Sequence, residues 1–448
     1  MRAPESAPQA RLTVLDGVSI MVGIVVGIGI FKTPPIVAAN VDSELAFIGV
    51  WLLGGLMTLI GALCYAELAA AYPSAGGEYN FLLRAYGRSL AVMFAWARCT
   101  VIQTGAIAAV SFVFGDYAAQ LLPLGTAGPA IYAALSVVVL SGINLLGTPQ
   151  STRAQLVFTI LTVATIFIVI VAGLLVTANG DSQLVQTPGA SGSGGGGALG
   201  LAMVFVLLTY GGWNEAAYLS AELRDGARNM VRVLVLGTAV LVFIYILMNL
   251  AYLHAFGLQG LRASEAPAAD LMRVAAGGLG AAVLSITVCA AAVSTLNATI
   301  FTGARVYYAL GRDLPALQRL GKWDERGDNP TTGIVVQCVI ALALVLLGAA
   351  TRDGFQAMVD YTAPVFWFFM LLVGASLFVL RWRDPGRERP FRVPLYPVTP
   401  LLFCLTAGYL LYSSLAYTGL GALIGVAVLA VGAPLVWMGR SQQTLPAE

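Results

Sequence analysis

Twelve apolar runs, each long enough to cross a membrane, dominate this sequence. They lie at 14–38, 45–72, 89–121, 130–147, 154–177, 199–221, 231–256, 276–304, 333–350, 356–380, 397–417 and 419–438. A helix needs roughly 20 apolar residues to cross about 30 Å of hydrocarbon. The chain is 58% hydrophobic and only 10% charged, with a mean hydropathy of +0.84. These values predict an all-α polytopic membrane protein with twelve transmembrane helices.

The positions of the basic side chains predict the orientation of the chain. With the N-terminus inside, all 24 Lys and Arg residues fall in cytoplasmic segments except Lys32, Arg98, Arg262, Arg273 and Arg352. Lys and Arg are retained on the cytoplasmic side, so both termini are predicted to be cytoplasmic in a plasma-membrane protein. Basic clusters at 305–326 and 381–392 could also contact nucleic acid or anionic lipid, but short loops are basic for topological reasons alone. No nucleic-acid partner is expected.

Two spans carry glycine breaks at matching places. The first span contains Gly27-Ile28-Gly29, and the sixth contains Tyr210-Gly211-Gly212-Trp213. Repeats with an odd number of helices are inverted relative to each other, and their broken helices meet at a cavity between the repeats. The pattern predicts a five-plus-five inverted repeat with discontinuous helices 1 and 6. The predicted segments are a tail at 1–12, repeats at 13–178 and 199–380, a flexible outer loop at 179–198, a cytoplasmic loop at 381–396, two further spans within 397–438 and a tail at 439–448. The polar stretches 257–275 and 312–332 are also predicted to be loops.

The chemistry of these breaks predicts a site for a small zwitterion. Glycines at mid-membrane are tolerated where the broken backbone lines a cavity inside the protein. Free N–H groups at a half-helix N-terminus suit a carboxylate, and unwound carbonyl groups suit an ammonium. Gly23 and Gly27, four residues apart, could instead form a small face for helix packing. Gly27 and Gly29 cannot share such a face, which favours the binding site.

Several motifs along the chain resemble those of one transporter family. They are Gly27-Ile28-Gly29-Ile30-Phe31, Cys64-Tyr65-Ala66-Glu67-Leu68, Ser74-Ala75-Gly76-Gly77-Glu78-Tyr79, Tyr210-Gly211-Gly212-Trp213-Asn214, Phe301-Thr302-Gly303-Ala304-Arg305 and Glu388-Arg389-Pro390-Phe391-Arg392-Val393-Pro394. Together they are similar to the amino acid–polyamine–organocation permeases, in particular the bacterial relatives of the L-type amino acid transporters. The resemblance implies the inverted-repeat fold and alternating-access transport of amino acids.

The resemblance also implies the residues of the substrate site. Gly27, Ile28 and Gly29 would bind the substrate carboxylate, and carbonyl groups from 208, 209 and 211 would take the ammonium. Aromatic side chains of spans six and ten would form the walls. The full expected set is Gly27, Ile28, Gly29, Ile30, Leu208, Thr209, Tyr210, Gly211, Trp213, Asn214, Phe366 and Trp367.

Three positions depart from the family pattern. Ile28 replaces the usual serine between the glycines, and Leu208 replaces a large aromatic gate residue. Thr162 stands where relatives have a lysine whose ammonium takes the place of a sodium ion. A sodium or proton could therefore be the coupling ion, with Ser294 and Thr295 as oxygen ligands, although such hydroxyls often bond their own helix. No other cofactor and no metal site is expected.

Charged side chains inside the spans need partners, because each costs about 2.5–3.5 kcal/mol at the bilayer centre. Arg98 is expected to pair with Glu215 or Glu67, as a static ion pair or a proton-linked switch. Lys32 is expected to extend its amine outward to water. Asp116, near the outer end of its span, is expected to be solvated.

The sequence thus predicts a secondary transporter of neutral L-amino acids, working as an exchanger or with ion-coupled uptake. No Walker-type loop, catalytic triad or metal-ligand cluster appears, which argues against a pump or an enzyme. The alternatives are a non-transporting amino-acid sensor on the same scaffold and a carrier of cationic amino acids or polyamines. The loop 122–130 contains no cysteine, so no disulfide-linked accessory subunit is expected and the protein would be a monomer or homodimer in the lipid bilayer.

Overall fold

The computed structural model describes residues 13–434 apart from 28, 73–76, 147–151, 177–195, 215–222, 224–225, 314–316, 325–328, 352 and 418. Every named element in this part of the chain is a helix, and an isolated β-bridge joins Asp324 to Asn329. Eight helical segments are long and apolar enough to cross a membrane. Four shorter apolar helices, at Val14–Gly23, Ile160–Leu175, Leu199–Thr209 and Gly421–Val431, lie in the remaining predicted spans. The all-α fold with twelve spans is confirmed.

The first predicted span consists of two helices, α1 (Val14–Val25) and α2 (Gly29–Ala39). A capping box between Thr13 and Asp16 begins α1. The Asp16 N–H donates to the Thr13 hydroxyl, and the Thr13 N–H donates to the Asp16 carboxylate. Helix α9 (Gly196–Thr209) forms the start of the sixth span and ends in a turn at 210–214. The predicted discontinuity of helix 1 is therefore present, and α9 stops where the sixth span was predicted to break.

Most of the remaining spans are each formed by one helix. The second, fourth, fifth, ninth, eleventh and twelfth are α3 (Glu44–Ala71), α7 (Gly128–Leu145), α8 (Thr152–Leu175), α12 (Thr331–Ala349), α14 (Val398–Tyr417) and α15 (Gly419–Val431). The tenth is α13 (Gly354–Arg383), which the Asp353 carboxylate caps by accepting from the Gln356 N–H. A separate short helix, α4 (Gly77–Tyr86), lies between the second and third spans.

The third span contains a π-helical turn that the sequence did not reveal. Helix α5 (Arg88–Ala97) passes into the turn η1 (Arg98–Ile102) and then into α6 (Gln103–Leu121). Such turns are rare and occur frequently at functional sites. This one places Arg98 at its first residue.

The predicted loop at 257–275 is largely helical, which corrects the prediction. Helix α10 (Gly226–Arg262) continues through a kink at Gly257, and α11 (Pro267–Asp313) begins before a bend at 276–277. Gly257 and Gly277 have φ values of 62° and 67°, a region that glycine adopts without steric cost. Polarity alone suggested a loop, but these bends let apolar residues such as Leu261 and Leu271 fold back into the core.

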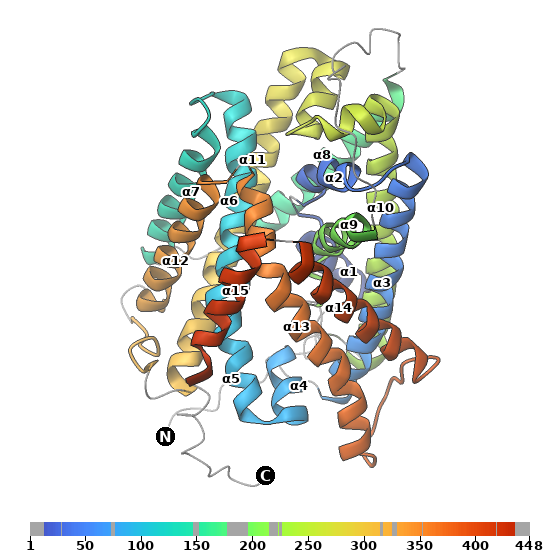
Figure 1. Ribbon diagram of the computed structural model, residues 1–448, viewed down its shortest axis with the longest axis vertical. Coiled ribbons are helices and arrows are strands. Elements are labelled where there is room, and N and C mark those ends of the chain that lie inside the picture. Colours follow the sequence, from blue (N-terminus) through green and yellow to red (C-terminus); the bar gives the residue numbers. More distant parts are fainter. Residues whose placement is uncertain are drawn as a thin grey trace.

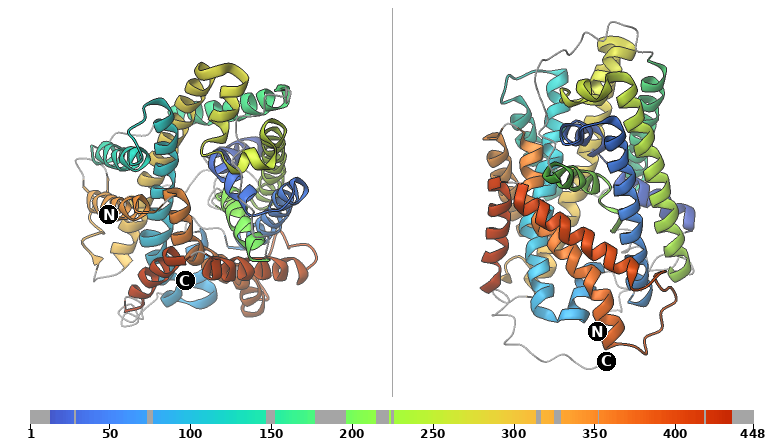
Figure 2. Two further views of the ribbon diagram at one scale, coloured as in Figure 1. Left: turned by 45° about the horizontal axis from the view of Figure 1, so that its top comes forward. Right: turned by 45° about the vertical axis from the view of Figure 1, so that its right-hand side comes forward.

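Helices α2 and α9 lie at mid-height in the bundle, between the upright helices α3 and α10 on one side and α6 and α11 on the other (Figure 1). The view in Figure 2 (right) agrees, and α2 contacts both α9 and α10. Helices α4 and α5 lie at the lower end of Figure 1, opposite the turn that joins α10 to α11. The two chain breaks are therefore inside the protein, between its ends.

Candidate substrate site

The two chain breaks contact each other directly at Gly29 and Thr209. A β-carbon placed on Gly29 would lie 3.2 Å from Thr209 Cγ2 and 3.3 Å from Thr209 Cα. That separation is shorter than ordinary van der Waals contact, so a side chain at Gly29 would require Thr209 to shift by a few tenths of an ångström. The first turn of α2 also begins here, with N–H groups that have no partner inside the helix.

Tyr245 of α10 joins the backbones of the two breaks. Its hydroxyl lies 2.8 Å from the Val25 carbonyl oxygen, at the end of α1, and 3.2 Å from the Thr209 carbonyl oxygen, at the end of α9. The side chain is fully buried. A hydroxyl has one proton, so Tyr245 donates to one carbonyl at a time and holds the two chain ends within hydrogen-bond distance. Nothing in the sequence singled out this residue, because a tyrosine in an apolar span is more often part of the packing.

The turn after α9 depends on its glycines and on aromatic neighbours. Gly212 has a φ of 100°, a conformation that other residues rarely adopt. The buried Tyr210 donates its hydroxyl proton to the Trp51 carbonyl oxygen at 3.2 Å. Trp213 meets Tyr65 edge-to-face, with 4.8 Å between ring centroids. Both predicted wall residues thus have their aromatic rings packed against α3 (Glu44–Ala71), which fixes the path of the chain beyond α9.

Asn214, at the end of this turn, belongs to a buried polar network. Its side chain donates to Glu78 Oε1 at 2.6 Å, and Arg98 Nη1 lies 3.1 Å from Glu78 Oε2. Only 3% of the Glu78 surface is exposed. The network therefore connects the unwound end of the sixth span to α4 and to the π-helical turn.

Arg98 has a partner that was not expected, and this corrects the expected pairing with Glu67. The expected partners were Glu67 and Glu215, but the structure places Glu78 beside Arg98. Glu67 instead accepts two hydrogen bonds from Arg381, at 2.7 and 2.6 Å, and one from the Val393 N–H. Glu215 lies outside the described residues. The error arose because α4 folds back under the third span, an arrangement that no sequence spacing indicates.

A second buried ionic cluster lies in α2, three residues after Gly29. Lys32 Nζ is 2.9 Å from Asp116 Oδ2 of α6 and 3.5 Å from Asp353 Oδ2. The neighbouring Tyr117 donates to the Phe31 carbonyl oxygen at 2.9 Å. The prediction that Lys32 extends to water is therefore wrong, whereas Asp116 pairs with Lys32 and keeps 19% of its side-chain surface exposed. Lys32 is only 7% exposed, since two carboxylates from other helices satisfy its charge inside the protein.

The other predicted residues occupy three different settings. Trp367 is buried in α13 and Phe366 is partly buried beside it, with 5.1 Å between their ring centroids. Thr295 donates to the Ala291 carbonyl oxygen of its own helix. This agrees with the alternative in which the hydroxyl bonds its own helix backbone. Ser294 and Thr162 are buried in α11 and α8, which pack against each other. Ile28 lies outside the described residues.

Comparison with known proteins identifies close matches along nearly the whole chain. A family model described as "Amino acid permease" matches residues 12–436. The human b(0,+)-type amino acid transporter 1 is 29% identical to this chain, over 90% of this chain and 82% of that protein. The mouse large neutral amino acids transporter small subunit 2 is 27% identical, over 98% of this chain and 83% of that protein.

Proposed function

Because this chain belongs to the amino acid permease family, we propose that it is a secondary transporter of neutral L-amino acids in the plasma membrane, with both termini cytoplasmic. As a permease it moves amino acids across the membrane and is not an enzyme. The observation that carries the proposal is the direct contact between the two chain breaks at Gly29 and Thr209.

The substrate would bind between these breaks through its backbone groups. Its carboxylate would face the N-terminus of α2, where the partial positive charge of the helix favours an anion. Its ammonium would face the carbonyl groups at the end of α9, including that of Thr209. Tyr245 already donates to this group of carbonyls, and it would hold them in place during binding.

The side chains at the breaks support a neutral substrate. Gly27, Gly29, Ile30, Leu208 and Thr209 carry no charge. The Glu78 carboxylate, which Asn214 connects to the end of the sixth-span turn, is already engaged with Arg98 and Asn214. A cationic substrate side chain would therefore lose its hydration on entering the site, and no described acidic side chain would be available to compensate for that loss.

Transport assays with the purified full-length protein test the proposal. Proteoliposomes would be supplied with a panel of labelled amino acids, with and without internal amino acid and with imposed sodium or proton gradients. We expect uptake of neutral L-amino acids. Stimulation by internal amino acid would identify an exchanger, and stimulation by a gradient would identify ion coupling. Binding without uptake would favour a sensor, and uptake of only cationic amino acids or polyamines would contradict the neutral-substrate assignment.

If a sodium gradient drives uptake, Ser294 and Thr295 are the proposed oxygen ligands. Ser294→Ala or Thr295→Ala would then raise the sodium concentration needed for half-maximal uptake.

A further inference from the structure

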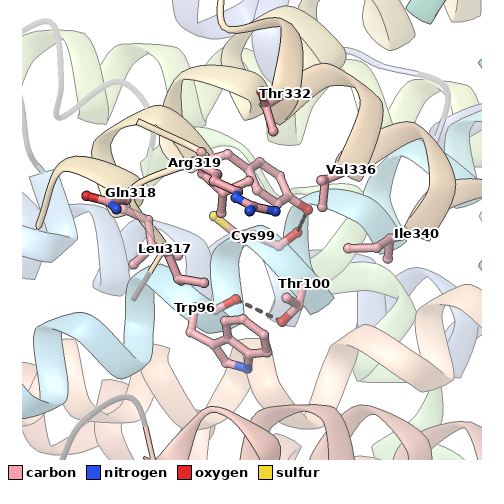
Figure 3. Close-up of a pocket in the computed structure, with 12 residues that line it drawn as sticks. Trp96, Cys99, Thr100, Leu317, Gln318, Arg319, Thr332, Val336 and Ile340 are labelled. Atoms are coloured by element: carbon pink, nitrogen blue, oxygen red, sulfur yellow. Dashed lines mark hydrogen bonds between the residues drawn. The ribbon is translucent and has the colours of Figure 1, made fainter. Parts of the chain in front are cut away.

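A cavity lies between α5, the π-helical turn, α11, α12 and the segment 317–320, beside basic residues that the charge distribution predicts to be cytoplasmic (Figure 3). Its volume is about 480 Å³, within the roughly 300–1,000 Å³ of typical small-molecule pockets. Thr332, Val336 and Ile340 of α12 line one side of it. They are four residues apart in sequence, so they form a continuous stripe along one helix face.

The opposite walls come from the third and eighth spans. Trp96 lines the cavity from α5, and Leu310 from α11. The indole N–H of Trp96 donates to the Val428 carbonyl at 3.0 Å, so this ring presents its apolar face without an unmet donor. The cavity is therefore lined mainly by aliphatic and aromatic groups, which suit a hydrocarbon chain.

Arg319 adds a positive charge to this apolar cavity. It lines the cavity from the segment between α11 and α12, and in Figure 3 its guanidinium group projects toward the space between Cys99 and Val336. Within the described part of the chain, Arg319 takes part in no ion pair. Arg312 precedes it and Lys322 follows it in the same basic segment, and both are exposed.

We propose that this cavity binds an anionic phospholipid from the surrounding membrane. The acyl chain would occupy the apolar space beside Val336 and Ile340, and the phosphate would pair with Arg319. Basic pockets between transmembrane helices on the cytoplasmic side bind anionic lipid headgroups for this reason. A small soluble anion would satisfy Arg319 but leave the apolar walls facing water, so a lipid matches both features.

The lipid would contact the π-helical turn and so influence the inner network. Cys99 and Thr100 of this turn line the cavity, and Tyr307 donates to the Cys99 carbonyl at 2.6 Å. The preceding residue, Arg98, pairs with Glu78, which in turn holds Asn214 at the end of the sixth span. A bound lipid would stabilise this turn and favour the intact network. This second step rests on the proposed transport function, whereas lipid binding itself does not.

Photolabelling of the reconstituted full-length protein tests lipid binding without any transport measurement. The probe is phosphatidylglycerol with a diazirine at the end of one acyl chain, in phosphatidylcholine vesicles, and the matched probe is phosphatidylcholine with the same diazirine. Labelled peptides would be identified by mass spectrometry. We expect the anionic probe to label residues 96–100 and 332–340 more strongly than the zwitterionic probe does.

Two variants separate the charge from the cavity. Arg319→Gln should reduce labelling by the anionic probe roughly five-fold, the effect of one basic group near a membrane surface, and leave the zwitterionic probe unchanged. Val336→Trp should reduce labelling by both probes, because it fills the cavity. Arg232→Gln, which removes an exposed basic residue of α10, is the control and should change neither.

The outcomes decide the proposal. Equal labelling by the two probes, labelling confined to other helices, or unchanged labelling in Arg319→Gln would overturn it. Arg319 is exposed, so its variant should fold even if Val336→Trp does not. For the second step, phosphatidylglycerol should increase the uptake rate of the parent protein and not that of Arg319→Gln. Equal stimulation of both would refute that step and leave the binding result standing.

Discussion

The close approach of Gly29 and Thr209 leaves little room for a side chain at the point where the two chain breaks meet. A β-carbon at Gly29 would be only 3.2 Å from Thr209 Cγ2. By contrast, a β-carbon at Gly142 of α7 meets no described atom within 4 Å. A larger side chain is therefore expected to be tolerated at Gly142 and not at Gly29, and this difference can be tested directly.

Gly29→Val should lower uptake by on the order of a hundredfold, the scale expected when binding groups are displaced by about 1 Å. The added methyl groups would push α2 away from α9 and separate the two sets of backbone groups. Uptake by proteoliposomes and elution on size exclusion would measure activity and folding. Gly142→Val is the control and should transport normally. Parent-level uptake by Gly29→Val would remove the carboxylate site from the start of α2.

Tyr245→Phe should raise the KM for uptake roughly tenfold. The variant retains the ring and loses the hydroxyl, so the carbonyls of Val25 and Thr209 lose a shared donor, a loss that costs about 1–3 kcal/mol for a buried group. Concentration-dependent uptake provides the measurement. Tyr132→Phe removes a similar hydroxyl that donates to the Leu122 carbonyl at 2.8 Å, far from the breaks, and should leave KM unaltered. An unchanged KM in Tyr245→Phe would show that the bridge has no part in binding.

At the scale of whole helices, α2 is held in place by neighbours on several sides. Lys32 and Phe31 connect it to α6 through an ion pair and a hydrogen bond. Arg262, at the end of α10, donates to the carbonyl oxygens of Ala38 and Val41, at 2.8 and 2.5 Å. The helix that begins at the proposed carboxylate site is thus tied to α6 near its start and to α10 at its far end.

Lys32→Met should loosen α2. It leaves the carboxylates of Asp116 and Asp353 together without their shared cation, and breaking a buried ion pair costs about 3 kcal/mol or more. Amide hydrogen exchange within 29–39 should accelerate by on the order of a hundredfold. Lys322→Met, at an exposed position, is the control. Adding Asp116→Asn to Lys32→Met should restore part of the protection, because one of the two unpaired charges is removed. Equal exchange in all these proteins would show that the cluster does not hold α2.

At the scale of the whole molecule, ionic contacts connect the substrate-site helices to the rest of the bundle at two levels. The Lys32 cluster lies beyond the start of α2, and the Glu78 network lies beyond the end of α9, next to α4 at the lower end of Figure 1. In the proposed alternating-access mechanism, one level would open while the other stays closed. The two clusters are suited to these roles because each joins a helix next to a break to helices outside the proposed site.

Glu78→Gln should slow transport more than it weakens substrate binding. Glutamine can still accept from Asn214, but it cannot neutralise Arg98, so the inner network would hold the turn at 210–214 less firmly. We expect the maximal rate to fall roughly tenfold with little change in KM. Arg98→Met combined with Glu78→Gln should recover part of this rate, as removal of both charges of a buried pair is better tolerated than removal of one. Additive losses in the double variant would contradict coupling between the two side chains.

The sequence by itself determined the number and order of the spans and the place where the first helix breaks. These properties follow from hydrophobic length and from glycine, which act locally along the chain. It also identified Gly29 and Thr209 as candidates, although their roles in binding remain predictions. Its expected partner Glu67 for Arg98 was wrong, the alternative partner Glu215 stays a prediction, and the expected environment of Lys32 was wrong.

Only the tertiary structure decided which buried charges and hydroxyls meet. Arg381 pairs with Glu67 across 314 positions of sequence, and Tyr245 reaches Val25 across 220. Such pairs depend on which faces of neighbouring helices come together. Because these spans are apolar on nearly every side, the sequence pattern does not show which face of each helix packs inward. In a membrane, each ionisable group must find a partner inside the protein, so the fold selects the partner after the helices have packed.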